Sequence, residues 1–389
     1  MSVELNDVAT RTRQNVESVL GGAGFEHLWH VWLFASCFLG LALVGWWLHE
    51  REGGRRGVRG FLGFLFPARV YRHPSSWSDI KLSIINQVAS PASFALAAYL
   101  GGWLASATSW TLTQVFDWNA DFNWGIVSIA ALTLCLALVS DFATYVVHRL
   151  HHTVPALWEI HKVHHSAEVL SPLTVMRKHP VFDLLSRGLK ALLVGPLQGV
   201  VFFLFAGPVD VLTAVGANLV FGLYHMFGAG LRHSHVRLSY GPRVEHVLIS
   251  PAQHQIHHSR ARRHWDRNFG QIFALWDWAF GTLYVPVRRE HLEFGIDGVP
   301  ATDHAGLVTG CFRPMANAVR VALGGTPCTG DSAPRSDRCP GNAAGWPQGE
   351  ALVEARSAPR RLGEGWTGAA VSVRRSGSEP GQGPQHHIR

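Results

Sequence analysis

Charged residues are scarce in this chain, and long apolar runs take their place. Of its 389 residues, 16% are Asp, Glu, Lys or Arg and 47% are hydrophobic, with 15 Trp and 21 Phe. This composition is more apolar than that of an ordinary soluble protein. It indicates an integral membrane protein with substantial parts in water.

Cysteine is also scarce, and the five cysteines follow no ligand or disulfide spacing. Cys37 and Cys135 lie inside apolar runs, where a buried thiol is the expected state. Cys311, Cys328 and Cys339 come late in the chain without a CxxC pair. Neither a zinc ribbon nor a disulfide scaffold is therefore indicated.

Several other signatures are missing. No basic segment followed directly by an apolar core opens the chain, so no cleavable signal peptide is expected. No GxGxxG follows a predicted strand, and no ferredoxin-type cysteine run occurs. The net charge is +7, but the basic residues lie beside apolar runs and near the C-terminus. We therefore expect a membrane face and no nucleic-acid binding.

Long apolar runs predict the membrane-spanning helices. Three of them, 28–48, 82–104 and 124–147, each approach the ~20 residues that cross a bilayer. A fourth run, 189–224, is interrupted by two Gly-Pro pairs. It predicts a helical hairpin that enters and leaves on the same side, with a pair of buried core helices as the alternative.

The distribution of Lys and Arg predicts the orientation. The loop 51–81 is rich in basic residues, whereas 105–122 has no Lys or Arg. The positive-inside rule places the first loop in the cytoplasm and the second outside. The third helix then runs inward, and its end at His148 lies on the cytoplasmic side.

Histidine is abundant, with 23 residues, and it forms three clusters. These are His148-Arg-Leu-His151-His152, His161-Lys-Val-His164-His165 and His254-Gln-Ile-His257-His258. Spacings of three and four residues place rings on one face of a helix. Imidazole binds iron, copper and zinc. Nine histidines are too many for one tetrahedral ion, so the pattern suits two metals held close together; solvated or capping histidines are the alternative.

The residues within and before the clusters agree with dioxygen chemistry. The clusters contain no cysteine, and a thiolate ligand at a metal that activates dioxygen would itself risk oxidation.

Asp141, two helical turns before His148, is a carboxylate inside the third apolar run. We expect it to orient a histidine, with a snorkelling or pore-lining role as the alternative.

Longer motifs resemble the fatty acid hydroxylase/sterol desaturase superfamily. They are His148-Arg-Leu-His-His152, Leu157-Trp-Glu-Ile-His161-Lys-Val-His164-His165-Ser166 and Arg177-Lys-His179-Pro180, and then Ser250-Pro-Ala-Gln-His254-Gln-Ile-His257-His258-Ser259, Asn268-Phe-Gly270 and Leu275-Trp-Asp277-Trp-Ala-Phe-Gly-Thr282. The Trp-Asp-x-x-Phe-Gly-Thr ending is not expected in acyl-CoA desaturases. The resemblance extends over about 66–297.

The resemblance implies an all-α membrane bundle with a cytosolic di-iron site. Such enzymes use O₂ and two electrons to hydroxylate or desaturate lipids. The implied ligands are His148, His152, His161, His164, His165, His233, His254, His257 and His258. His179, like Asp141, is expected beside the ligands. His151 is left out, and His225 and His235 stay open as ligands.

The partners implied are a membrane lipid and a separate electron donor, either a reductase, a ferredoxin or a cytochrome b5-like protein. Arg260, Arg262 and Arg263 form either part of its docking patch or a solvated basic face. The aromatic residues of 276–280 form either a substrate wall or a membrane belt. We expect the protein in a bacterial inner membrane or, in a eukaryote, in the endoplasmic reticulum.

Other functions remain open at this stage. An acyl-lipid desaturase with three related histidine boxes would use the same ligand types. A metal transporter would place its ligands near the middle of the spans, whereas these clusters follow the spans. A zinc hydrolase would leave about half of the histidines unexplained. A non-catalytic scaffold explains the hydropathy alone.

The expected domain organisation has three parts. Residues 1–27 form a polar N-terminal segment, and 28–308 form the membrane-embedded catalytic domain, with its motifs in 124–297. Residues 309–389 are rich in Gly, Pro, Arg, Ser and Ala. This composition predicts a disordered low-complexity tail.

Overall fold

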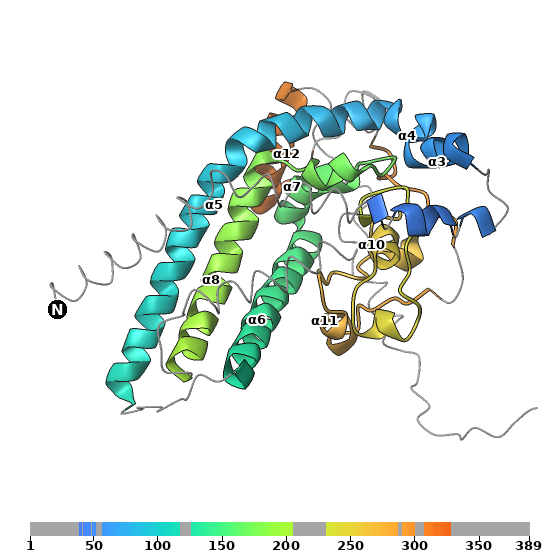
Figure 1. Cartoon of the computed structure of the whole chain (residues 1–389). Helices are drawn as coiled ribbons and strands as arrows, with labels where there is room; N and C mark the ends of the chain where they lie inside the picture. Colours follow the sequence, from blue (N-terminus) through green and yellow to red (C-terminus); the bar gives the residue numbers. More distant parts are fainter. Residues whose placement is uncertain are drawn as a thin grey trace, which may run out of the picture. The chain divides into compact units, whose positions relative to one another are not determined.

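Three long apolar helices form the part of the chain that is suited to a membrane. They are α5 (Pro74–Val115), α6 (Ile126–Thr153) and α8 (Pro180–Leu204). Each of them is long enough, and contains an apolar stretch long enough, to cross a bilayer. This computed structural model describes residues 39–40, 42–47, 49–51, 57–116, 126–204, 231–286, 290–299 and 307–327. Figure 1 shows α5, α8 and α6 side by side.

The helices α5 and α6 confirm the predicted spans 82–104 and 124–147, and α8 shows that 189–204 is helical, while the hairpin itself stays a prediction. Residues 205–224 and 28–38 lie outside the described residues. The prediction was wrong for part of the loop 105–122, because α5 continues as a helix to Val115. Helix propensity and packing against α8 extend it beyond the apolar run.

Helix α5 has 42 residues and is therefore about 63 Å long, twice the roughly 30 Å of a bilayer core. Its first two turns bury Ser75, Ser76, Ser78 and Asp79. Buried polar side chains of this kind need protein partners, which lipid cannot supply. The start of α5 therefore belongs to the polar part of the protein, and the apolar span follows it.

Small residues allow α5 and α8 to approach closely. A Cβ atom on Gly199 of α8 would lie 2.5 Å from the backbone oxygen of Ala105, and one on Gly195 would lie 2.8 Å from that of Gly101. Two backbones this close leave no room for a side chain between them. This packing through small residues is typical of helices that associate within a membrane.

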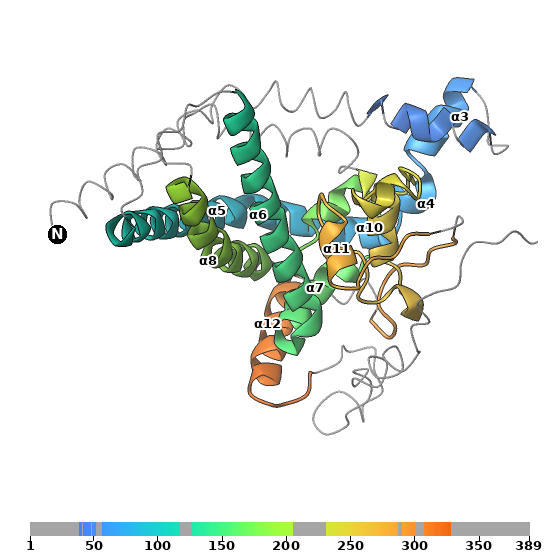
Figure 2. The ribbon, with the colours of Figure 1, turned by 90° about the horizontal axis from the view of Figure 1, so that it is seen from below.

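Short helices gather at the end of α6 and carry the remaining motifs. Helix α7 (Pro155–His165) follows α6 and packs against it, and α11 (Leu275–Ala279) also contacts α6. The others are η1 (Pro172–Met176), η3 (Val244–His246), α10 (Pro251–His257) and η4 (Arg262–His264). In Figure 2, α7, α10 and α11 lie around the same end of α6. The two later histidine clusters, on α7 and α10, are thereby brought to the end of α6, which carries the first cluster.

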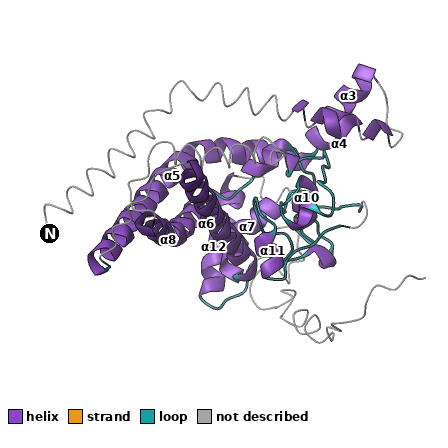
Figure 3. Cartoon of the chain, turned by 60° about the horizontal axis from the view of Figure 1, so that its bottom comes forward, coloured by secondary structure: helices purple, strands orange, loops and turns teal. Residues whose placement is uncertain are grey.

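The described residues contain helices and loops without a strand longer than an isolated bridge, as Figure 3 shows. The expected helical membrane fold is confirmed; which side of the membrane the histidines face stays a prediction. Two further helices, α3 (Gly57–Leu65) and α4 (Ala68–Tyr71), precede α5.

Helix α12 (Leu307–Ala322) corrects one expectation. Disorder was predicted from residue 309, but this segment is helical and packs against α7. Its buried face includes Pro314, Asn317 and Ala318. Small residues on that face gave little apolar signal in the sequence, although they fit closely against a neighbouring helix. Residues 328–389 lie outside the described part of the chain.

Candidate metal centre

Nine histidines converge in two adjoining groups. One ligand nitrogen from each of His148, His152, His161, His165 and His257 lies within 4.8 Å of the others, and the same holds for His164, His233, His254 and His258. These nine are the residues that the sequence analysis selected as ligands. The structure thus brings the proposed ligands together as a set of five and a set of four.

Helix geometry explains how neighbouring histidines reach a common point. His148 and His152 are four residues apart in the last turns of α6. His161 and His165 have the same spacing on α7, and one turn of helix separates them. His254 on α10 and His258, the residue that caps its end, repeat it, with Ser250 capping the start of the helix. Each pair therefore places two rings on the same helix face.

The ring nitrogens approach one another as metal ligands do. The Nε2 atom of His254 lies 2.9 Å from that of His233 and 3.2 Å from that of His258, and the Nε2 atoms of His233 and His164 are 3.0 Å apart. Imidazole nitrogens bound at about 2.1 Å from one ion are separated by about 3.0 to 3.4 Å in octahedral and tetrahedral sites. The four nitrogens are thus spaced as ligands of a single ion.

Backbone carbonyls hold three of the rings from behind. The Nδ1 atom of His148 donates to the Phe269 carbonyl at 2.9 Å, and that of His257 donates to the Arg267 carbonyl at 2.8 Å. In the other group, His164 Nδ1 donates to the Arg177 carbonyl at 3.1 Å. A proton fixed on Nδ1 leaves the Nε2 lone pair available for a metal.

Burial keeps these side chains neutral. Removal from water lowers the pKa of His161, His164 and His165 well below the ordinary value. It acts in the same direction on the pKa values of His233, His254, His257 and His258. The Nε2 atoms of His152 and His257 are buried without a hydrogen-bond partner. Neutral rings with unsatisfied buried nitrogens fit transition-metal ions.

Two buried carboxylates stabilise the loop that contains Arg267 and Phe269, whose carbonyls bind His257 and His148. Asp277 accepts hydrogen bonds from the backbone amides of Phe269 at 2.8 Å and Gly270 at 2.7 Å, and from the Thr282 hydroxyl at 2.6 Å. Asp141 accepts from the amides of Ile272 and Phe273. Both carboxylates are fully buried, and together they fix the course of residues 269–273.

The prediction that Asp141 binds and orients a histidine was therefore wrong. The residue is buried as expected, but it binds two amides and the indole N–H of Trp276, 3.0 Å away, instead of a histidine. A buried carboxylate surrounded by free amide donors satisfies them first. Asp277 was not among the residues predicted for the site. It lies between two tryptophans in the sequence, and a charged residue between aromatic residues is a signal of burial with partners.

An ion pair supports the four-histidine group from the other side. The fully buried Arg177 side chain donates to Asp79 of α5 at 3.0 Å, to the Val163 carbonyl at 3.0 Å and to the Ser166 hydroxyl at 2.9 Å. Its own carbonyl accepts from His164. Arg177 thus joins the start of α5 to α7 and to a ring of the candidate site. Arg177 stands in one of the motifs of the sequence, but the spacing of the residues gives no sign of this link.

The remaining histidines lie elsewhere. His179 was expected beside the ligands, but its Nε2 donates to the Cys311 carbonyl of α12 and its Nδ1 accepts from the Val181 amide. It caps α8, because the residue before a helix can satisfy a free amide. His151, left out of the ligand set, binds the Val147 carbonyl. His235 binds the Phe64 carbonyl, so neither belongs to the two groups. His225 lies outside the described residues.

The expected docking arginines are largely engaged with acidic residues. Arg260 pairs with Glu293 and Asp297, and Arg263 pairs with Glu290. Arg262 lies over the ring of Trp265. These exposed ion pairs reduce the positive charge of the patch.

The aromatic residues of 276–280 divide into two sets. Trp276 packs on Phe142 of α6, whereas Trp278 and Phe280 are exposed. The exposed rings are compatible with a membrane belt.

Comparisons with known proteins identify the motif-bearing segment. Residues 133–282 match the family model described as Fatty acid hydroxylase. The chain is 28% identical over 207 residues to ornithine lipid hydroxylase OlsE of Rhizobium tropici, covering 52% of this chain and 57% of that protein. It is 31% identical over 189 residues to human alkylglycerol monooxygenase, covering 48% and 36%, respectively.

A plant protein gives a similar result. The putative Delta(7)-sterol-C5(6)-desaturase 2 of Arabidopsis thaliana is 27% identical over 184 residues, which cover 46% of this chain and 56% of that protein. The chain therefore spans less than two thirds of each of these relatives. No solved structure matches. The segment that carries all nine histidines thus matches the model of the fatty acid hydroxylase family.

Proposed function

We propose that this protein is a membrane-bound oxygenase that uses O₂ and two electrons to hydroxylate an unactivated C–H bond of a lipid. Two irons would be held by the nine histidines. The observation that carries the proposal is the convergence of a set of five and a set of four imidazoles, seven of them buried, at the end of a candidate membrane helix. The matched relatives, a lipid hydroxylase and an alkylglycerol monooxygenase by name, support a lipid substrate.

Bound iron would supply the reduction of O₂ and the removal of hydrogen from the lipid. The lipid gains one oxygen atom, and the second oxygen leaves as water. The protein holds the rings through the carbonyls of Arg177, Arg267 and Phe269. It also buries the ring nitrogens, and a dry site prevents side reactions with water.

The placement of the ligands argues against transport. Only His148 and His152 lie within a candidate membrane helix, and they lie in its last turns. The other seven histidines come from segments outside the three candidate spans. A transporter would hold its ion near the middle of the membrane.

The site is proposed to face the cytoplasm, where an electron donor is available. This follows from the basic 51–81 segment, which includes the start of α5, and from the absence of Lys and Arg from 105–122. No electron-carrying cofactor motif was found in the sequence, so a separate reductase, ferredoxin or cytochrome b5-like protein would supply the electrons.

Desaturation is the second candidate outcome, because one relative is named as a putative sterol desaturase. Both reactions begin with removal of one hydrogen atom. They differ in whether oxygen is transferred to the carbon or a second hydrogen is lost. Geometry near 1 Å at the lipid decides between them.

The test compares the lipids of cells that contain the intact protein with those of cells that contain His257→Ala. Mass spectrometry is expected to reveal a lipid that has gained one oxygen atom, or lost two hydrogen atoms, only with the intact protein. The purified intact protein is expected to carry about two irons per chain. Identical lipid profiles, together with an iron content of zero after iron-replete anaerobic purification, would exclude the proposal.

A further inference from the structure

A pocket of about 440 Å³ lies directly beside the four-histidine group. Its wall includes Ser234 and Gln255, the residues that follow the proposed ligands His233 and His254. Such a volume lies near the lower end of the roughly 300 to 1,000 Å³ of small-molecule sites. The pocket can therefore take a small group but not a complete lipid.

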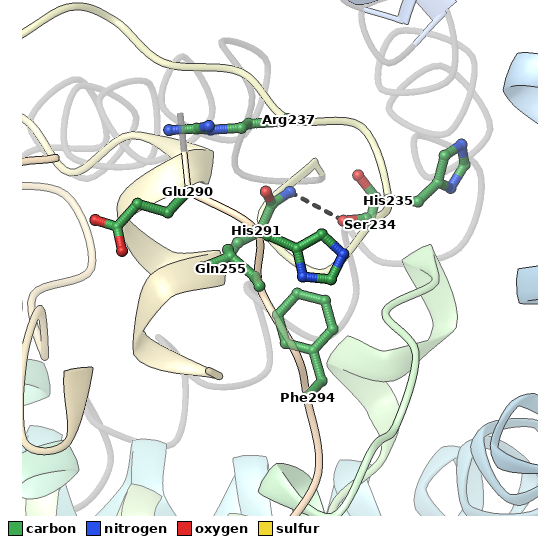
Figure 4. Close-up of a pocket in the computed structure, with 8 residues that line it drawn as sticks. Ser234, His235, Arg237, Gln255, Glu290, His291 and Phe294 are labelled. Atoms are coloured by element: carbon green, nitrogen blue, oxygen red, sulfur yellow. Dashed lines mark hydrogen bonds between the residues drawn. The ribbon is translucent and has the colours of Figure 1, made fainter. Parts of the chain in front are cut away.

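Cationic and apolar side chains line this pocket together. In the view of Figure 4, Arg237 and Glu290 lie on one side and His235 on the other, with the rings of His291 and Phe294 between them. Leu292 and Phe294 supply apolar surface. A lining with both characters suits the junction between the polar head and the first methylene groups of an amphiphile.

Arg237 gives the lining of the pocket a cationic group. Both oxygens of Glu290 already accept hydrogen bonds, Oε2 from Arg263 at 2.7 Å and Oε1 from the Tyr284 hydroxyl at 2.6 Å. Its charge is therefore compensated by Arg263, which does not line the pocket. Arg237 contributes a permanent positive charge with a geometry that suits phosphate and carboxylate.

Hydrogen bonds from Gln255 hold the backbone at the floor of the pocket in place. The Gln255 side-chain amide donates to the carbonyls of Leu231 at 3.2 Å, Ser234 at 2.9 Å and Val236 at 2.9 Å. These bonds fix the segment that carries both His233 and Arg237. A ligand held by Arg237 would therefore lie at a defined position relative to the candidate metal centre.

The opposite wall connects the pocket to a surface suited to lipid headgroups. His235 donates to the Phe64 carbonyl of α3 at 2.7 Å. On this side of the protein, Val58, Leu62 and Phe66 are 76%, 49% and 60% exposed at a spacing of four residues. Exposed arginines accompany them in the same segment, namely Arg59, Arg69 and Arg72. An apolar stripe flanked by cations is typical of a helix at the interface with anionic lipids.

We infer that this pocket binds the anionic headgroup of the lipid substrate, so that the substrate class is lipids whose headgroup carries a phosphate or carboxylate. The inference rests on the proposed function. Arg237 binds the anion, and Phe294 and Leu292 contact the adjoining apolar part. The headgroup then positions the chain beside the histidines.

The test measures lipid binding without turnover, with the purified full chain in detergent micelles. Dioleoylphosphatidylglycerol and dioleoylglycerol, which share their acyl chains, are titrated separately by native mass spectrometry. The intact protein is expected to bind the anionic lipid more tightly. Arg237→Gln should weaken that binding about tenfold or more, the value of a charge-assisted hydrogen bond, and leave dioleoylglycerol binding unchanged.

Two further variants separate the pocket from general effects. Arg262→Gln removes the same charge from an exposed side chain outside the pocket and should change neither affinity. His291→Glu places a carboxylate on an exposed lining residue, where no loss of folding is expected, and should weaken binding of the anionic lipid alone. Metal content per chain reports whether each variant is folded.

Three results would overturn the inference. The first is an unchanged affinity for phosphatidylglycerol in both pocket variants, and the second is an equal loss of affinity for both lipids. The third is binding of inorganic phosphate as tight as that of the lipid, which would assign the pocket to a free anion. Because no turnover is measured, the result can be interpreted even if no lipid is oxidised. In that case the proposed function alone would fail.

Discussion

Backbone carbonyls, more than side chains, orient the proposed ligands. Three rings donate to the carbonyls of Phe269, Arg267 and Arg177. A carbonyl is present at every residue, so it leaves no mark in the sequence. The nine histidines could be predicted because imidazole is a distinctive ligand at helical spacing. Their supports could not, and Asp141 was assigned the wrong partner for this reason.

Asp277→Asn tests the brace behind the five-histidine group. The amide keeps one carbonyl oxygen but adds two N–H donors, which cannot accept from Phe269, Gly270 and Thr282. Movement of the Phe269 carbonyl should release His148, and metal affinity should fall about 10- to 100-fold, as is usual when a supporting partner is lost. Metal content under competition with a chelator measures this.

Asp297→Asn provides the control, since this carboxylate is 70% exposed in its ion pair with Arg260. Its metal affinity should equal that of the intact protein, because exposed ion pairs contribute little. An Asp277→Asn protein that keeps its metal as tightly as the control does would show that the loop is held by other contacts.

At the level of elements, the sequence predicted apolar helices well and a small-residue helix poorly. The spans 82–104 and 124–147 are evident from continuous hydropathy. In α12, Pro314 lies inside the helix and the buried face is made of small and polar residues. Composition therefore indicated disorder, whereas tertiary packing against α7 stabilises the helix. Packing partners of this kind are not visible along the chain.

Two truncations test the importance of α12. A chain ending at residue 327 keeps this helix and should retain activity and metal. A chain ending at residue 306 loses it, exposes the face of α7 that it covers and removes the Cys311 carbonyl that binds His179. It should melt at a lower temperature and lose most of its metal, because α7 carries three of the proposed ligands.

The thermal unfolding of both truncations and of the full chain should be followed by circular dichroism in the same detergent. Equal melting temperatures and metal contents for the two truncations would show that α12 has no part in supporting the site. A defect already present in the chain ending at 327 would instead assign a role to residues 328–389.

At the level of the whole molecule, hydropathy and charge together predict both the spans and the side on which the site lies. The spans 82–104 and 124–147 are present in the structure as long apolar helices, whereas the side remains a prediction. It depends on the basic segment before α5 and on the chain after α5, which has no Lys or Arg up to residue 122.

Cysteine labelling tests this orientation. Single cysteines are placed at Thr113, at the far end of α5, and at Arg262, near the candidate site; both side chains are exposed, and the native cysteines are replaced by serine. A membrane-impermeant maleimide should label the Thr113→Cys protein in intact cells and the Arg262→Cys protein only after permeabilisation. The reverse pattern would place the histidines outside the cytoplasm and remove the proposed access to a soluble electron donor.

The buried ion pair between Asp79 and Arg177 has a genetic consequence. Breaking such a pair leaves an uncompensated charge in the interior, which costs about 3 to 5 kcal/mol. Because Arg177 also touches α7 and its carbonyl holds His164, the damage would spread to the histidines. A screen of random variants scored by bound metal would therefore recover substitutions at Asp79, a position with no ligand chemistry of its own, among those in the histidine boxes.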